Sequence, residues 1–254
     1  MVMINNLIKK LEKYFLIGAL YLATASLDIV YADDFSKGAR GPENRQLDVR
    51  TTYSVNEKDV ETITNNVILK YWDGDEFGKF AFISIPYKFI NSPKGSDNGI
   101  GDISLGLGPR GRIDNLHWFL YGSLTFPTGE AGLGNKRDDA KAGALATCFI
   151  DEKRFEIDGI LEHNFTGENN SGTNPPNETY AGFLVGRKVT KKTRAGIGLT
   201  ELIKDNGDYI TNWKVALRYT ASPKLHFELV GDKGIYSRNM SESTGIGLFT
   251  RYNW

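Results

Sequence analysis

The sequence holds one cysteine and three histidines, and this scarcity excludes several kinds of site. Cys148 alone supports neither an intramolecular disulfide framework, nor a CxxC redox pair, nor a cysteine-based zinc site. His117, His163 and His226 are widely scattered, so we expect no metal site, and we expect no bound cofactor. Lysine plus arginine equals aspartate plus glutamate at 31 each, which leaves no basic field for a nucleic-acid partner.

Long apolar runs are also missing, except near the N-terminus. Basic residues at 9–13 precede the apolar run 15–27, and a branched and a small residue follow at 30 and 32, before two aspartates. This arrangement is typical of a secretory signal peptide that is cleaved after Ala32. Thirteen residues are few for a spanning helix, although an uncleaved anchor is the alternative.

After residue 32, no segment carries the roughly eighteen consecutive apolar residues of a membrane helix. A chain without such a helix spans a bilayer only as a closed barrel, because a barrel pairs all its backbone groups between strands. We therefore divide the chain into a signal peptide (1–32), a flexible polar lead-in (33–44) and a transmembrane β-barrel (45–254).

Segments of about ten residues with alternating side chains recur from residue 45 onward. In 209–219, Trp213 and Val215 face one way, whereas Lys214 and Arg218 face the other. Tilted strands of this length cross a lipid bilayer. The pattern predicts twelve strands, at 46–55, 62–72, 79–89, 102–112, 116–126, 141–150, 155–165, 179–188, 193–201, 209–219, 225–232 and 244–254.

Long polar connections alternate with short ones along this series. The long ones are 56–61, 90–101, 127–140, 166–178, 202–208 and 233–243. Bacterial barrels have an even number of strands, long outer loops and short periplasmic turns. A soluble sandwich gives no reason for this alternation. The sequence therefore predicts an all-β, antiparallel up-and-down barrel of about 12 strands in the bacterial outer membrane.

Charged side chains of both signs occupy the face opposite the apolar one. Because charges are costly in lipid, we expect them to face the barrel interior. They either line a channel or form a salt-bridged network that fills the lumen, since twelve strands lie between a packed eight and an open sixteen. Asp48 shares this face with the pore-lining candidates Arg50, Lys70, Arg110, Arg112, Glu156, Asp158, Glu162, Arg194, Lys214, Arg218, Glu228 and Arg251.

Two local features fit this prediction less well, and a third supports it. Pro86 lacks a backbone donor inside a strand, so we expect a β-bulge there. The strand 116–126 is apolar on both faces, which leaves its orientation open. Trp254 ends the chain behind alternating apolar residues. This ending resembles the terminal signal by which the outer-membrane assembly machinery recognises bacterial barrels, with tryptophan in place of the more usual phenylalanine.

An enzymatic site has little support in the sequence. Some twelve-stranded outer-membrane barrels hydrolyse lipids, which requires a serine or cysteine within reach of an oriented histidine. His163 is the best candidate, with Asn164 beside it, but no serine lies two positions away on its strand face. We therefore expect no catalytic residues and interpret His163 as a histidine at the membrane interface.

The hairpin 98–130 carries a family resemblance. Gly99-Ile100-Gly101-Asp102 leads into one strand, and Phe126-Pro127-Thr128-Gly129 leaves the next. With these motifs at this spacing, the chain resembles the family named for the meta-pathway of phenol degradation. The resemblance implies an outer-membrane barrel that passes small, often hydrophobic or aromatic, compounds. The topology places the marked ends together on the outer rim, at Gly99, Gly101, Asp102, Pro127, Thr128 and Gly129.

The sequence thus predicts a passive pore or transporter for small, hydrophobic or aromatic, molecules. Its partners are the lipid bilayer, the assembly machinery and a permeant that the sequence does not name. Two alternatives stay open at this point, namely an outer-membrane lipid-modifying enzyme and a structural barrel with a closed lumen.

Overall fold

The computed structural model describes residues 45–254, apart from 57, 75, 94, 131, 132, 136, 152, 153 and 169–174. The predicted signal peptide and lead-in lie outside the described residues. Within the described part of the chain, no helix is long and apolar enough to cross a membrane.

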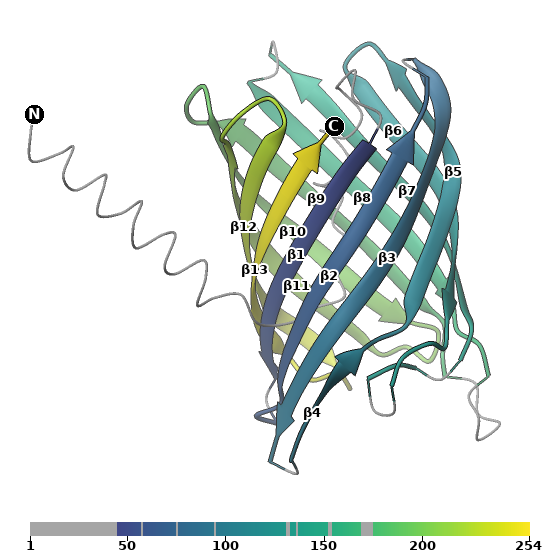
Figure 1. Ribbon diagram of the computed structural model, residues 1–254. Helices are drawn as coiled ribbons and strands as arrows, with labels where there is room; N and C mark the ends of the chain where they lie inside the picture. The colour runs from purple at the N-terminus through teal and green to yellow at the C-terminus, as the bar shows by residue number, and fades with distance from the viewer. Residues whose placement is uncertain are drawn as a thin grey trace, which may run out of the picture.

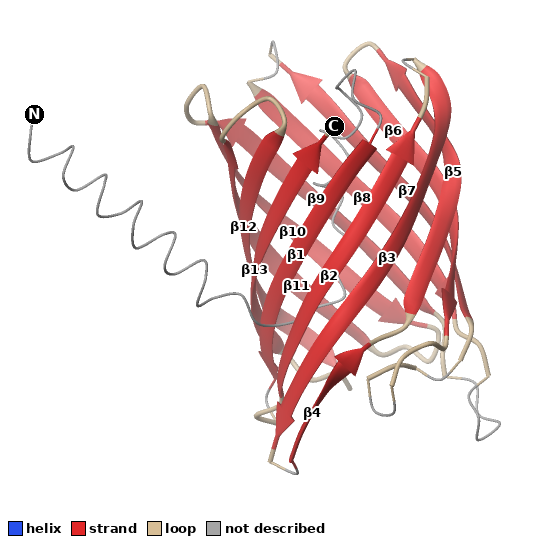
Figure 2. Ribbon diagram, viewed as in Figure 1, coloured by secondary structure: helices blue, strands red, loops and turns tan. Residues whose placement is uncertain are grey.

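The described residues form strands joined by loops and turns (Figure 2). Each predicted range overlaps one of them, and 155–165 coincides with β8. The strands are β1 (Arg45–Asn56), β2 (Glu61–Trp72), β3 (Phe77–Ser92), β4 (Gly95–Ile100), β5 (Ile103–Ile113), β6 (Leu116–Phe126), β7 (Asp139–Ile150), β8 (Phe155–Phe165), β9 (Glu178–Lys188), β10 (Thr193–Lys204), β11 (Tyr209–Thr220), β12 (Leu225–Arg238) and β13 (Ser243–Asn253).

All strands except β4 belong to one closed antiparallel barrel. Each pairs with its chain neighbours, β3 pairs with β5, and β1 closes the ring against β13. The barrel thus has twelve strands, as predicted. Figure 1 shows the tilted strands, with the C-terminus and the short turns at one end and β4 with the longer loops at the other. Bacterial barrels have short periplasmic turns and long outer loops, so the end with the C-terminus is periplasmic and the end with β4 is the outer one.

β4 was not predicted, because 90–101 was assigned to an outer loop. β3 continues to Ser92 and pairs back with β4 from Tyr87↔Ile100 to Ser92↔Gly95. This ribbon continues beyond the outer rim (Figure 1). Outside lipid, a strand needs no alternation of apolar residues, and the sequence GSDNGI of β4 has none.

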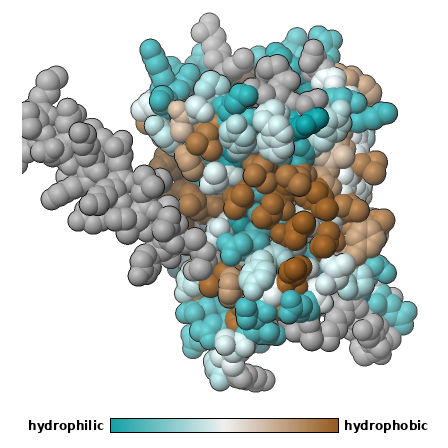
Figure 3. Space-filling model, viewed as in Figure 1, coloured by the Kyte–Doolittle hydropathy of each residue, from teal (hydrophilic) through white to brown (hydrophobic). Residues whose placement is uncertain are grey.

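Apolar side chains cover the outside of the barrel. Large apolar residues on every barrel strand are exposed, and they alternate with buried polar residues. Figure 3 shows a brown belt across the middle of the visible face, between more hydrophilic ends. An apolar band of this kind faces lipid in outer-membrane barrels. Its members include Val49, Leu69, Leu107, Leu120, Leu161, Phe183, Ile197 and Val215.

The orientation of β6, which the sequence left open, is settled by packing inside the lumen. Phe119 and Tyr121 are buried, whereas Leu120 and Leu124 are about half exposed on the outside. The Phe119 ring lies 5.2 Å from the Phe80 ring between centroids, in an edge-on arrangement. Aromatic packing between β6 and β3, on the lumen side of β5, therefore decides which face of β6 points inward.

The β-bulge expected at Pro86 is absent from the β2–β3 ladder. The β2–β3 register runs without a shift through Asn66↔Pro86. On its other side, β3 stops pairing with β5 at Ser84 and starts pairing with β4 at Tyr87. Pro86 therefore sits where the ladder changes partner, and its carbonyl still accepts the Gly101 N–H at 2.9 Å. The register on this side shifts by one, because residues 85 and 86 of β3 face the three residues 101–103, so the extra residue lies opposite Pro86 and not in β3.

The membrane placement predicts a depth-dependent cost on β5. Leu107 and Ile113 share its outer face and are 71% and 64% exposed, but Leu107 is near mid-strand and Ile113 is at the periplasmic end. We expect L107R to lower the free energy of unfolding by about 2–4 kcal/mol, and I113R by about 0–1 kcal/mol. Urea unfolding in lipid vesicles measures both. Equal costs would contradict a lipid-facing band centred on Leu107.

Candidate functional site in the barrel lumen

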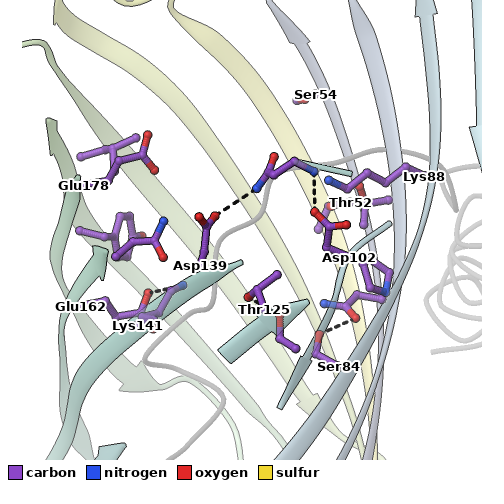
Figure 4. Close-up of a pocket in the computed structure, with 18 of the residues that line it drawn as sticks. Thr52, Ser54, Ser84, Lys88, Asp102, Thr125, Asp139, Lys141, Glu162 and Glu178 are labelled. Atoms are coloured by element: carbon purple, nitrogen blue, oxygen red, sulfur yellow. Dashed lines mark hydrogen bonds and ion pairs between the residues drawn. The ribbon is translucent and has the colours of Figure 1, made fainter. Parts of the chain in front are cut away.

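The outer half of the lumen contains a cavity of about 550 Å³, here called the mouth cavity. Inward-facing side chains near the outer ends of the strands line it, as Figure 4 shows. Hydroxyl, amide and charged groups dominate the lining. They include Thr52, Ser54, Ser84, Lys88, Asp102, Thr125, Asp139, Lys141, Glu162 and Glu178.

Asp102 organises the rim of this cavity. Its Oδ1 accepts the Gly129 N–H at 2.9 Å, and its Oδ2 accepts the Asn135 N–H. A Cβ on Gly129 or Gly134 would collide with this carboxylate, so the close approach requires glycine. One buried carboxylate therefore holds the connection between β6 and β7 against the start of β5.

The predicted outer-rim motif comes together around Asp102. Thr128 Oγ1 accepts the Ile103 N–H at 2.9 Å, directly after Pro127. A Cβ on Gly99 would lie 2.5 Å from the Glu130 carboxyl carbon, and Glu130 N donates to Ile100 O at 2.9 Å. Gly101 donates to the Pro86 carbonyl, as described above. These bonds shape the rim and involve mainly backbone groups.

Asn135 extends the rim toward the opposite wall. Its side-chain nitrogen lies 3.4 Å from Asp139 Oδ2, while its backbone binds Asp102. Asp139 Oδ1 also accepts Arg137 Nε at 2.7 Å and the Gly167 N–H at 2.9 Å. The interactions join the start of β5, β7 and the β8–β9 connection. Dashed lines in Figure 4 mark the part that runs from Asp102 to Asp139. Asp139 and Lys141 were not among the predicted site residues, although both alternate inward with Leu145 on β7.

A second set of outer contacts joins the β10–β11 and β12–β13 connections. Asp208 Oδ1 accepts Asn239 Nδ2 at 3.0 Å, and Asp208 Oδ2 accepts Asn206 Nδ2 at 2.7 Å. These bonds, first from Asn239 and then from Asn206, hold the pKa of Asp208 below its usual value.

The periplasmic half of the lumen is filled, partly by the Asp48 cluster (Gln46, Asp48, Arg50, Lys70 and Arg251). Asp48 is 1% exposed, and its carboxylate is 2.6 Å from Lys70 Nζ. It also lies 3.2 Å from Arg50 Nη2 and 3.3 Å from Arg251 Nε, and it accepts Gln46 Nε2 at 2.7 Å. Three cations around one anion are tolerable here because further carboxylates lie nearby in the lumen.

The Glu156 cluster (Glu156, Arg194, Arg218 and Glu228) forms the other charged part of the filling. Glu156 binds Arg218 Nη1 at 2.8 Å and Arg194 Nη1 at 3.1 Å. Arg218 Nε also lies 3.3 Å from Glu228. These residues come from β8, β10, β11 and β12, so the cluster ties one wall of the barrel together.

An apolar cluster fills the remaining space in this half. Gly106 and Gly143 leave room for the rings of Phe82 and Tyr121, because a Cβ at either glycine would overlap them. The cluster consists of Trp72, Phe80, Phe119, Tyr121, Leu145 and Ile160, with Phe82 and Tyr180 packed against it.

The twelve pore-lining candidates fall into three groups. Arg50 and Glu162 line the mouth cavity. Arg112 is exposed at the periplasmic rim, where its Nε donates to the Asp114 carbonyl at 3.1 Å. The other nine lie inside the barrel, buried or nearly so, and most are tied into the filling: Lys70, Arg110, Glu156, Asp158, Arg194, Lys214, Arg218, Glu228 and Arg251.

His163 lies on the outward face of β8. Its Nδ1 is 2.9 Å from Thr179 Oγ1, and its ring packs edge-on against Phe165 at 4.5 Å between centroids. Among the described residues, no serine or cysteine forms a hydrogen bond with it. The contacts are those of a histidine held in the wall of the barrel.

The family model described as "Putative MetA-pathway of phenol degradation" matches residues 44–249. The chain belongs to this family. No curated relative matches its sequence. The membership agrees with the resemblance that the rim motifs carry.

Several solved structures are similar in fold. An outer membrane channel from Pseudomonas putida F1 superposes with a TM-score of 0.74 at 16% identity, over 90% of this chain and 100% of the channel. The NanC porin gives 0.54 at 14% identity, over 82% and 100%. The P. putida toluene transporter TodX gives 0.55 at 7% identity, over 87% and 92%. The chain therefore has the fold of an outer-membrane barrel, and its apolar belt and family place it in the bacterial outer membrane.

The Asp48 cluster predicts a large stability effect. We expect D48N to lower the free energy of unfolding by about 3–5 kcal/mol, because it leaves three buried cations without their shared anion. The control D151N breaks an exposed pair with Arg154 at 3.8 Å, and we expect it to cost at most about 1 kcal/mol. Denaturant unfolding measures both variants. A D48N cost as small as the control would show that the cluster is not held by Asp48.

The rim predicts a local effect of Asp102. In D102N, one carboxylate oxygen becomes an NH2 group that faces a backbone donor, so the β6–β7 connection should loosen. We expect faster trypsin cleavage after Arg137 without loss of the folded barrel. D97N serves as the control, because Asp97 is exposed on β4 and accepts only its neighbour's N–H. Unchanged cleavage in D102N would argue against this role.

Proposed function

We propose that the chain is a passive pore or transporter that lets small molecules cross the outer membrane through the barrel. The observation that carries the proposal is the mouth cavity, which lies inside the lumen at the outer end. Its volume is within the range of about 300–1,000 Å³ that is usual for small-molecule sites. A solute arriving from outside meets this cavity first.

The filled periplasmic half is the barrier in this proposal. A permeant leaves the mouth cavity past the Asp48 cluster, the Glu156 cluster and the apolar cluster, and side chains shift to let it through. Charges of both signs pair within this section, so we expect the barrier to select only weakly between anions and cations.

The similar structures support this class of function without naming the permeant. The toluene named for TodX is a substrate of that protein. Family membership makes small aromatic compounds one class to test for this chain. The direction of transport follows the concentration gradient, since the described residues supply no ATPase or other energy-coupling domain.

Two alternatives are less well supported. For a lipid-modifying enzyme, His163 would need a nucleophile, and its hydrogen-bonding partner is Thr179. We therefore propose that the chain is not an enzyme. A structural barrel with a closed lumen agrees with the filled periplasmic half but gives no role to the mouth cavity. The experiment below separates it from a pore.

We further propose how the chain reaches the membrane. Residues 1–32 act as the export signal, and 33–44 link the cleavage point to the barrel. Trp254 closes the barrel seam, where its N–H donates to the Arg45 carbonyl at 3.1 Å and its ring stacks on Tyr252. Its position at the seam supports a role in recognition by the assembly machinery.

Planar-bilayer recording tests the pore. We expect current steps from the wild-type protein and larger steps from F119A, because the truncation empties part of the apolar cluster. F183A is the matched control, since Phe183 is half exposed on the lipid-facing side of β9. The buried truncation should cost about 3–5 kcal/mol of stability, so folding of both variants is checked by heat-dependent gel migration.

The absence of current steps and of solute flux in both the wild type and F119A would contradict the proposal and favour a structural barrel. Equal conductance in F119A and the wild type would instead place the barrier outside the apolar cluster.

A further inference from the structure

By residue type, the lining of the mouth cavity is mainly polar. Hydroxyl and amide side chains outnumber apolar ones by thirteen to five. An apolar ligand in such a cavity would remove water from these groups without replacing its hydrogen bonds, which is unfavourable. A ligand that carries many hydroxyl groups would replace them.

The acidic groups of the lining are already engaged within the protein. Glu162 pairs with Lys141 at 3.3 Å, and Glu178 pairs with Lys204 at 2.8 Å. Asp139 pairs with Arg137, and Asp102 accepts two backbone N–H groups, as described above. Because these carboxylates have partners, a cationic solute gains little by entering. Two of the basic groups are paired as well, Arg50 with Asp48 and Lys141 with Glu162, so the charge pattern favours an uncharged ligand.

Two buried polar atoms of the lining lack a partner. Thr64 is 3% exposed and Asn212 is 8% exposed, and both line the cavity. Among the described residues, neither Thr64 Oγ1 nor Asn212 Oδ1 has a hydrogen-bond partner. Buried polar side chains are nearly always satisfied, so two exceptions in one cavity point to a ligand.

The strand geometry around Asn212 supports this assignment. The register of β11 with β12 shifts between Thr211 and Asn212, which is the position of a β-bulge. Asn212 lies opposite Gly234, which has no side chain to compete for the space. The extra residue of the bulge is Ile235 on β12, and Asn212 keeps the inward alternation of β11. Thr64 on β2 and Asn212 on β11 approach the cavity from different parts of the wall.

We propose that the mouth cavity binds an uncharged, hydroxyl-rich solute of the sugar or polyol class, with Thr64 and Asn212 as direct contacts. The inference rests on the proposed function, because it names the class of solute that the pore admits. It differs from the aromatic class that the family resemblance implies. A hydrocarbon leaves Thr64 Oγ1 and Asn212 Oδ1 unpaired, whereas a polyol supplies both a donor and an acceptor.

Equilibrium dialysis of the full folded barrel in detergent micelles tests the proposal. The probes are radiolabelled glucose, sorbitol and phenol, each corrected for uptake by empty micelles. We expect glucose or sorbitol to bind more tightly than phenol. T64V and N212L should each weaken that binding by about fivefold, because T64V replaces the hydroxyl with a methyl group and N212L replaces the amide with two methyl groups of the same branching.

Two further variants separate a binding role from a structural one. T64S retains the hydroxyl and should bind the polyol nearly as well as the wild type. T250V makes the same chemical change on the outer face of β13, where it should have no effect on binding. Heat-dependent gel migration confirms that each variant is folded.

The proposal is overturned if phenol binds more tightly than both glucose and sorbitol, or if none of the three probes binds. It is also overturned if T64V and N212L bind glucose and sorbitol as tightly as the wild type does. Bilayer currents are recorded on the same preparations. Currents without polyol binding would support the proposed pore and contradict this inference. Polyol binding without currents would contradict the proposed pore and support a binding site.

Discussion

Closure of the sheet is the constraint on which the rest of this structure depends. In lipid, a strand edge with unpaired N–H and C=O groups is too costly to persist. The chain meets this requirement at the β1–β13 seam, where pairing runs from Gln46↔Asn253 to Asn56↔Ser243. The barrel therefore has no free edge within its wall, and β4, which has one, stands beyond the outer rim.

Closure also separates two environments across a single layer of backbone. Side chains alternate along each strand, so one face meets lipid and the other meets the lumen. The outer face carries leucine, valine, isoleucine and aromatic rings, and the inner face carries the charges. Charges that would be costly in lipid are paired inside, as in the Asp48 and Glu156 clusters. A polar interior is thus a consequence of the same alternation that makes the belt apolar.

The lumen is not uniform along its length. Its periplasmic half is filled by ion pairs and aromatic rings, and its outer half contains the mouth cavity. Asp102 fixes the rim by holding the β6–β7 connection through backbone N–H groups. A rigid rim above a polar cavity allows selection of solutes at the entrance, before they meet the barrier.

The sequence by itself determined the strands and their faces, because alternation with a period of two is a local property. It located β8 to the residue, and it placed Asp48, Glu156 and Arg218 on the inner face. The alternation of long and short connections also predicted that Asp102 and Gly129 lie at the same rim of the barrel. β4 was not predicted, because a strand outside the membrane carries no lipid-facing pattern.

Only the tertiary structure decided which inward side chains meet. Asp48 and Arg251 are 203 residues apart and touch because closure makes β1 and β13 neighbours. The orientation of Phe119 follows from its contact with Phe80, two strands away in the same wall. Thr64 and Asn212 share one cavity because the strand tilt and curvature bring distant walls together. Such contacts depend on the geometry of the whole ring, which no local pattern encodes.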